Sequence, residues 1–272
     1  MWNSYIKNII RSILFRSHSP IWYLRKGSLI LSDYGNYSRR KKIALNFSSF
    51  NISSLHHKGW TDELEIEKNL LDTVISYCNE ISVSLDPLNQ PPQFSTKKNF
   101  WRILVNKQNI DQHPVIKDFA KNSYFLKIAS AYIGAEAVLS NVTLMKSYPT
   151  DWEFNKSQLW HLDGDDNKFL VFYLYCNIVD RNSGAFELIP KHFNKRRFIP
   201  RYFRKPNLLD AEVRKYSEPD QALEITGNSG KLFACDTAQV YHRGSRCKSN
   251  IRLALSIRYT SQEGLFPFDP IH

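Results

Sequence analysis

The chain is poor in cysteine, and its N-terminal apolar stretch is too short to span a bilayer. No Cys-x-x-Cys pair is present, which is typical of reduced, mostly structural thiols in a cytoplasmic protein. The chain also shows no internal repeat, and its N-terminus lacks a clear signal-peptide cleavage site. The four cysteines are Cys78, Cys176, Cys235 and Cys247.

Acidic residues are nearly absent from two segments of a chain whose net charge is +11. Residues 1–42 contain nine Lys or Arg and the single acid Asp33, and residues 191–205 contain seven basic residues and no acid. Such an excess favours an anionic partner. The second run is Lys191, Lys195, Arg196, Arg197, Arg201, Arg204 and Lys205.

Three interpretations of the second basic run stay open. It could be a solvated face, or it could bind an anionic small-molecule substrate such as a phosphate, a carboxylate or an acyl thioester. Nucleic acid is the third, but no sequence-specific reading module is present, so no specific nucleic acid is expected as a partner.

The N-terminal apolar residues fall near one face of a helix. This pattern is compatible with packing on the core, with peripheral membrane contact, or with a segment that mimics a transit peptide. The expected location is therefore the cytoplasm, with the membrane surface as an alternative. These residues are Trp2, Ile6, Ile9, Ile10, Ile13 and Leu14, with Lys7 and Arg11 alongside.

Composition predicts one globular, β-rich domain. Hydrophobic residues make up 42% of the chain and aromatic residues 14%, and 272 residues suffice for one large core. We expect a basic extension at 1–60, helical support at 61–135, and a β core at 136–262 with a basic insertion at 191–225.

Hydrophobic periodicity predicts the main elements of this domain. Helices are expected from Thr61 to about Ile81, and at 114–120 and 123–133, the last ended by Gly134. Residues 84–95 contain three prolines and are expected to form a loop. Residues 137–148 are expected to form the first core strand, followed by strands within 168–179, 185–190, 230–236 and 251–259.

A His-x-Asp pair followed by a distant His is the most informative motif. In a strand, His161 and Asp163 point to the same side, so one short strand supplies two ligands. His242 would arrive from another strand. Two imidazoles and one carboxylate can occupy one face of a six-coordinate metal and leave positions open, as in non-haem Fe(II) oxygenases. Arg252 supplies a charged fork suited to a dicarboxylate.

Three segments together resemble the phytanoyl-CoA dioxygenase family, which uses Fe(II) and 2-oxoglutarate. They are Gln158 to Gly164, Asn182 to His192, and Asp236-Thr237 leading into His242-Arg243-Gly244-Ser245. The resemblance covers roughly residues 112 to 260. It implies a double-stranded β-helix, a cupin-like jelly roll of mainly β structure with flanking helices.

The resemblance also implies roles for individual residues. His161, Asp163 and His242 would bind iron, and Arg252 would pair with the distal carboxylate of 2-oxoglutarate. The family often has a hydroxyl two residues after the second His; position 244 is Gly here, so Ser245 is the candidate substitute. Tyr175 would lie beside the co-substrate, or would be ordinary core.

The reaction implied is hydroxylation of an anionic small molecule or lipid-like substrate by O2, with 2-oxoglutarate converted to succinate and CO2. Related halogenases have a small residue in place of the carboxylate, so Asp163 favours hydroxylation. Two alternatives stay open: a non-catalytic binding module that keeps the fold, and a cupin-like metalloenzyme that does not use 2-oxoglutarate.

Overall fold

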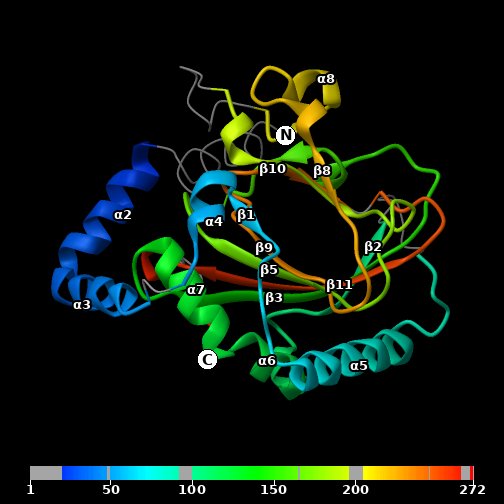
Figure 1. Cartoon of the computed structure of the whole chain (residues 1–272), viewed down its shortest axis with the longest axis horizontal. Helices are drawn as coiled ribbons and strands as arrows, with labels where there is room; N and C mark the ends of the chain where they lie inside the picture. The colour runs from blue at the N-terminus through cyan, green and yellow to red at the C-terminus, as the bar shows by residue number, and fades with distance from the viewer. Residues whose placement is uncertain are drawn as a thin grey trace, which may run out of the picture.

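Two antiparallel β-sheets form the centre of the computed structural model (Figure 1), which describes residues 20–47, 50–91, 100–164, 166–195, 205–244, 246–264 and 270–271. The six-stranded sheet has the order β1-β9-β5-β11-β3-β2, and the five-stranded sheet the order β7-β4-β10-β6-β8. The strands are β1 (Trp60–Thr61), β2 (Trp101–Val105), β3 (Val138–Ser147), β4 (Trp160–His161), β5 (Leu170–Tyr175), β6 (Phe186–Ile189), β7 (Asn207–Leu208), β8 (Leu223–Ile225), β9 (Leu232–Cys235), β10 (Tyr241–Arg243) and β11 (Arg252–Thr260).

Helices α5 (Lys68–Leu85), α6 (Pro114–Ala120) and α7 (Ser123–Ile133) cover the outer face of the six-stranded sheet (Figure 1). Helices α2 (Pro20–Ser32) and α3 (Tyr34–Leu45) lie at one side of the molecule, α4 (Ser53–Lys58) precedes β1, and α8 (Asp210–Val213) packs beside β7 of the five-stranded sheet. Short 3-10 turns are η1 (Ile110–Gln112), η2 (Lys156–Gln158), η3 (Lys191–Phe193), η5 (Pro219–Gln221) and η6 (Gln262–Gly264). No helix in the described ranges is long and apolar enough to cross a membrane.

The two faces of β11 divide the molecule into a core and a site. Leu253, Leu255, Ile257 and Tyr259 are buried in the cluster that includes α5, α6 and α7. The alternate positions point the other way. Ala254 packs with residues from both sheets, so this second face of β11 lines the space between the sheets.

Helix ends follow their expected signals in α6 and α7, whose predicted ranges are confirmed. The Asn122 side chain caps α7 by accepting a hydrogen bond from Tyr124 N at 2.8 Å, and Gly134 ends the helix with φ of 84°. The predicted start of the earlier helix at Thr61 is wrong, because Thr61 pairs with Ala234 as part of β1. Pairing to a distant strand overrides a local capping pattern.

The predicted core strands are present, mostly in shortened form, as β3, β5, β6, β9 and β11. However, residues 137–148 do not contain the first core strand, because β1 and β2 come earlier and extend the six-stranded sheet at its two edges. Within 191–225, β7 and β8 likewise join the five-stranded sheet. Both corrections concern edge strands of two to five residues, which carry little periodicity of their own.

The two basic segments are described only in part. The predicted N-terminal apolar face at residues 2–14 lies outside the described residues, as do the four arginines of the second run. Two of the three described lysines of the second run form ion pairs. Lys195 Nζ lies 2.8 Å from Glu218 Oε1, and Lys205 Nζ lies 2.9 Å from Glu212 Oε1. These two ion pairs, on either side of residues 196–204, agree with a solvated face at Lys195 and Lys205. All four cysteines are free and buried.

Candidate metal centre

Antiparallel pairing of β4 and β10 places His161 directly opposite His242. Asp163 follows β4, and its backbone N donates to Thr237 O at 2.9 Å, which fixes the chain just beyond the strand. The three side chains therefore meet between the sheets, with possible ligand atoms all within 4.8 Å of one another. The predicted triad is brought together by strand pairing across 81 residues of sequence.

The hydrogen bonds of the two imidazoles leave one ring nitrogen of each available. His161 Nδ1 lies 2.8 Å from Leu159 O, and His242 Nδ1 lies 3.0 Å from Val240 O. A carbonyl can only accept, so each Nδ1 carries the hydrogen and each Nε2 keeps its lone pair. A backbone carbonyl that accepts from the other ring nitrogen commonly orients a metal-binding histidine.

The free Nε2 atoms face a common carboxylate oxygen. Asp163 Oδ1 lies 3.7 Å from His161 Nε2 and 3.8 Å from His242 Nε2. An ion about 2.1 Å from each donor would require donor separations of at most about 4.2 Å. The two distances to Asp163 Oδ1 meet this limit, and the ligand atoms of all three residues lie within 4.8 Å of one another. The donor set of two imidazoles and one carboxylate therefore fits one metal ion with further positions open.

Electrostatics keep Asp163 and His242 in the protonation states that bind a cation. Burial alone would raise the pKa of Asp163, but His242, Arg258 and His161 together lower it to about 2. Burial, and next the neighbouring His161, lower the pKa of His242 to about 3. At neutral pH Asp163 is a carboxylate and His242 is neutral, as metal ligation requires.

Two residues that the sequence analysis missed complete the walls of this centre. Arg258 Nη2 lies 3.5 Å from Asp163 Oδ2. The ring of Phe186 stacks on His242 with 5.3 Å between centroids. Arg258 could have been found, because it lies six residues after Arg252 on the same face of β11. Phe186 carries no sequence signal beyond its place in a buried strand.

Arg252 is buried at the start of β11, and its Nη1 donates to Gly184 O at 2.6 Å. Gly184 has φ of 70°, and a Cβ there would lie 2.7 Å from the backbone N of Arg246, so the turn requires glycine. Gly244 borders the same guanidinium, since a Cβ at this position would lie 3.0 Å from Arg252 Nη1. A side chain at position 244 would therefore crowd the Arg252 guanidinium.

The remaining candidate residues differ in what the structure says of them. The Tyr175 hydroxyl donates to Ile225 O at 2.7 Å and accepts from Phe186 N at 3.1 Å, an arrangement that favours a core role. Gln158 is buried and its side chain accepts from Asn155 N at 3.2 Å, closing a capping box rather than being solvated. Ser245 lies outside the described residues.

The sequence matches no known protein-family model and no curated protein. Solved structures are similar in fold. The non-heme alpha ketoglutarate dependent epimerase SnoN from nogalamycin biosynthesis has a TM-score of 0.55 at 10% identity, covering 81% of this chain and 84% of that one. AviO1 from Streptomyces viridochromogenes Tue57 has a TM-score of 0.53 at 14% identity, covering 81% and 96%.

EctD from S. alaskensis, in its structure with 2-oxoglutarate and 5-hydroxyectoine, has a TM-score of 0.54 at 12% identity and covers 80% of each chain. At these identities the likeness establishes the fold. The chain is a mainly antiparallel β protein with flanking helices around a double-stranded β-helix core, as the sequence analysis predicted.

Proposed function

We propose that this protein is an Fe(II)/2-oxoglutarate-dependent oxygenase that hydroxylates an anionic small molecule or a lipid-like substrate. The observation that carries the proposal is the convergence of His161 Nε2, His242 Nε2 and Asp163 Oδ1, with both imidazoles oriented by backbone carbonyls. A buried arginine, Arg252, lies beside the residue two positions after His242.

Each part of this arrangement has a task. His161, Asp163 and His242 would hold the iron, and Arg252 would hold the distal carboxylate of 2-oxoglutarate as a fixed fork. When bound, iron and 2-oxoglutarate supply the oxidising chemistry that consumes O2 and releases succinate and CO2. Phe186 and the largely buried Tyr173 would exclude water from the space beside His242.

Structural relatives support the co-substrate. SnoN has been seen in complex with Fe3+ and alpha ketoglutarate, and EctD with bound Fe and with 2-oxoglutarate. The segments quoted above support a relationship to the phytanoyl-CoA dioxygenases in particular. Because SnoN is an epimerase, the relatives do not share one outcome; the carboxylate at position 163 is what favours hydroxylation over halogenation here.

Two other functions make different predictions. A non-catalytic module that keeps the fold would have no reason to retain both oriented imidazoles, the carboxylate and the buried arginine together. A cupin-like metalloenzyme without 2-oxoglutarate would bind iron but would leave Arg252 with no dicarboxylate to hold. Succinate formation that depends on added substrate separates the three possibilities.

The test is an anaerobic iron-loading step followed by measurement of succinate with a panel of carboxylate-, phosphate- and acyl-bearing candidates. We expect at least one candidate to raise succinate above the substrate-free background in wild-type protein. His242→Ala should abolish the rise, whereas His57→Ala, which alters an exposed histidine of α4, should not. Iron binding with no binding of 2-oxoglutarate would contradict the proposal.

A further inference from the structure

The outward faces of α2 and α3 form a surface with exposed apolar side chains. Leu24 and Leu31 of α2 are 74% and 76% exposed, and Tyr34 and Leu45 of α3 are also exposed. Together with three exposed basic residues of α3, Arg39, Lys41 and Lys42, we call these residues the α2–α3 surface. It lies at one side of the molecule, away from the five-stranded sheet (Figure 1).

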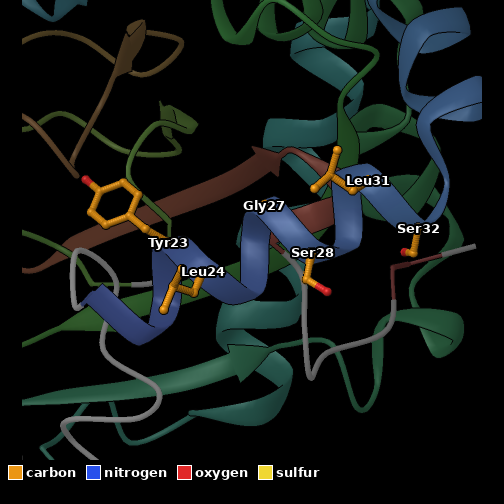
Figure 2. Close-up of a pocket in the computed structure, with 6 residues that line it drawn as sticks. All are labelled: Tyr23, Leu24, Gly27, Ser28, Leu31 and Ser32. Carbon is orange, nitrogen blue, oxygen red and sulfur yellow. The ribbon is translucent and has the colours of Figure 1, made fainter.

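The orientation of α2 is set by its opposite face. Trp22 is fully buried there, and Lys26 Nζ donates to the buried Asp166 at 2.8 Å. Leu24 and Leu31 lie on the other side of the helix, so the packing of α2 on the rest of the protein leaves them facing outward. Figure 2 shows the shallow pocket along this outward face, which is lined by Tyr23, Leu24, Gly27, Ser28, Leu31 and Ser32 and contains no charged side chain.

The exposed charges of α2 and α3 are mainly positive. Residues 20–47 contain six basic residues and the single acid Asp33. Lys26 is paired with Asp166, and Arg40 is paired with Glu263 in a buried ion pair, so these two are directed inward. In the described part of the chain, no carboxylate lies within ion-pair distance of Arg39, Lys41 or Lys42. Within the described ranges, the positive charge of Arg39, Lys41 and Lys42 therefore has no ion-pair partner.

We propose that the α2–α3 surface docks on an anionic lipid bilayer. Exposed leucine and tyrosine side chains and exposed lysine and arginine side chains on the same pair of helices match the two components of a membrane surface, the acyl boundary and the negative headgroups. A soluble anion would use the basic residues but would leave the apolar face of α2 in water. An anionic lipid surface accommodates both the exposed apolar side chains and the exposed basic side chains.

Docking of this kind would fix the metal centre relative to the bilayer. Asp166, which binds Lys26, lies three residues after Asp163 in the chain and also accepts from Thr260 at 3.1 Å and Ser261 at 3.0 Å. Helix α2 is thus tied to the segment that carries two of the three site residues. The surface contains none of those residues, so membrane binding and turnover can be tested separately.

The experiment is co-sedimentation of the full chain with vesicles of phosphatidylcholine alone or mixed with phosphatidylglycerol. We expect binding to the mixed vesicles that weakens as salt is raised. The double variant Leu24→Glu/Leu31→Glu should bind at least about tenfold more weakly, because two leucines no longer enter the apolar boundary. Lys41→Ala/Lys42→Ala should lose roughly fivefold per charge removed.

The matched control is Val83→Glu/Leu88→Glu, at and after the end of α5, where the side chains are 69% and 75% exposed. This control should bind vesicles as wild type does, and so should Asp163→Ala, whose failure in turnover would then be independent of membrane binding. Circular dichroism confirms that each variant is folded.

Several results would overturn the proposal. They are equal binding to vesicles without phosphatidylglycerol, wild-type binding by Leu24→Glu/Leu31→Glu, or an equal loss in the α5 control. Loss of binding in Lys7→Glu/Arg11→Glu while the leucine variant still binds would assign the contact to the preceding segment instead. Binding to a single-stranded oligonucleotide but not to vesicles would assign the surface to nucleic acid.

Discussion

Asp163 and Asp236 lie on neighbouring segments of the β core, and both carboxylates are largely or fully buried. Their surroundings nevertheless shift the two pKa values in opposite directions. Asp163 is surrounded by His161, His242 and Arg258, and its pKa falls to about 2. Burial raises the pKa of Asp236 to about 7, and the hydrogen bonds that it accepts offset only part of this effect.

The Asp163 side chain is 22% exposed and Asp236 is fully buried, but the larger difference lies in their partners. The closest partners of Asp236 are neutral donors: Tyr132 Oη at 2.7 Å and the backbone N of Ala238 at 3.0 Å. Neutral hydrogen bonds compensate a buried charge less well than a charged neighbour does. Lys168 and Lys191 add only smaller effects. The same residue type is thus placed as a proposed cation ligand at position 163 and as a structural anchor between α7 and the end of β9 at position 236.

The largest expected effect comes from removing the Asp163 carboxylate. Asp163→Ala removes the carboxylate that faces both imidazoles. Iron affinity and turnover should therefore fall by more than the roughly 100-fold seen when only a hydrogen-bond partner of a metal ligand is lost. Equilibrium dialysis with Fe(II) and succinate assays measure the two quantities. The thermal midpoint should stay close to that of wild type, and full retained hydroxylation would refute the ligand assignment.

Arg252→Leu tests whether Arg252 binds the distal carboxylate of 2-oxoglutarate near the Asp163 site. The substitution should weaken 2-oxoglutarate binding by about 2–5 kcal/mol, as expected when one partner of a buried charge pair is removed. Calorimetric titration of the iron-loaded protein gives the affinity. Arg214→Leu, which removes an exposed arginine paired with Asp220, should leave it unchanged; an unchanged affinity in Arg252→Leu would count against the assigned role.

Asp236→Asn tests the second environment through pH. Because the folded pKa of about 7 lies above the ordinary value of 3.8, the folded state holds the proton more tightly than the unfolded state. The contribution of Asp236 to stability should therefore be greatest below pH 4, decline between pH 4 and 7, and stay level above pH 7, with a total decline of at most roughly 4 kcal/mol.

In Asp236→Asn this decline should be absent from denaturant unfolding curves measured across the same range. The exposed acid Asp72 provides the control, since Asp72→Asn should keep the wild-type slope. A wild-type slope in Asp236→Asn would mean that Asp236 does not carry the pH dependence.

Tyr132→Phe is the smallest change and sharpens the contrast. It removes the hydroxyl that donates to Asp236, at an expected loss of about 1–3 kcal/mol of stability. Because this hydrogen bond lowers the pKa of Asp236, its loss should raise that pKa further and make the destabilisation greater at pH 8 than at pH 5. Unfolding at the two pH values measures this; an equal loss at both would indicate a packing effect alone. Tyr23→Phe is the exposed control.

The sequence predicted site residues where the pattern that identifies them lies within one strand or turn. The His-x-Asp spacing, the alternation of β11 and the glycine turn at Gly184 are local patterns, and the structure brings the residues concerned together. The Asp236–Tyr132 pair joins residues 104 apart with no shared pattern, and β1 forms by pairing Trp60 with the distant Cys235. Such contacts depend on the packing of the whole chain, which periodicity does not encode.

The most direct test of the central claim is an anaerobic calorimetric titration of 2-oxoglutarate into the protein with and without Fe(II). The account predicts tight binding that requires iron, that disappears in Asp163→Ala and that weakens in Arg252→Leu. Binding of equal strength without iron, or no binding to the iron-loaded wild-type protein, would contradict it.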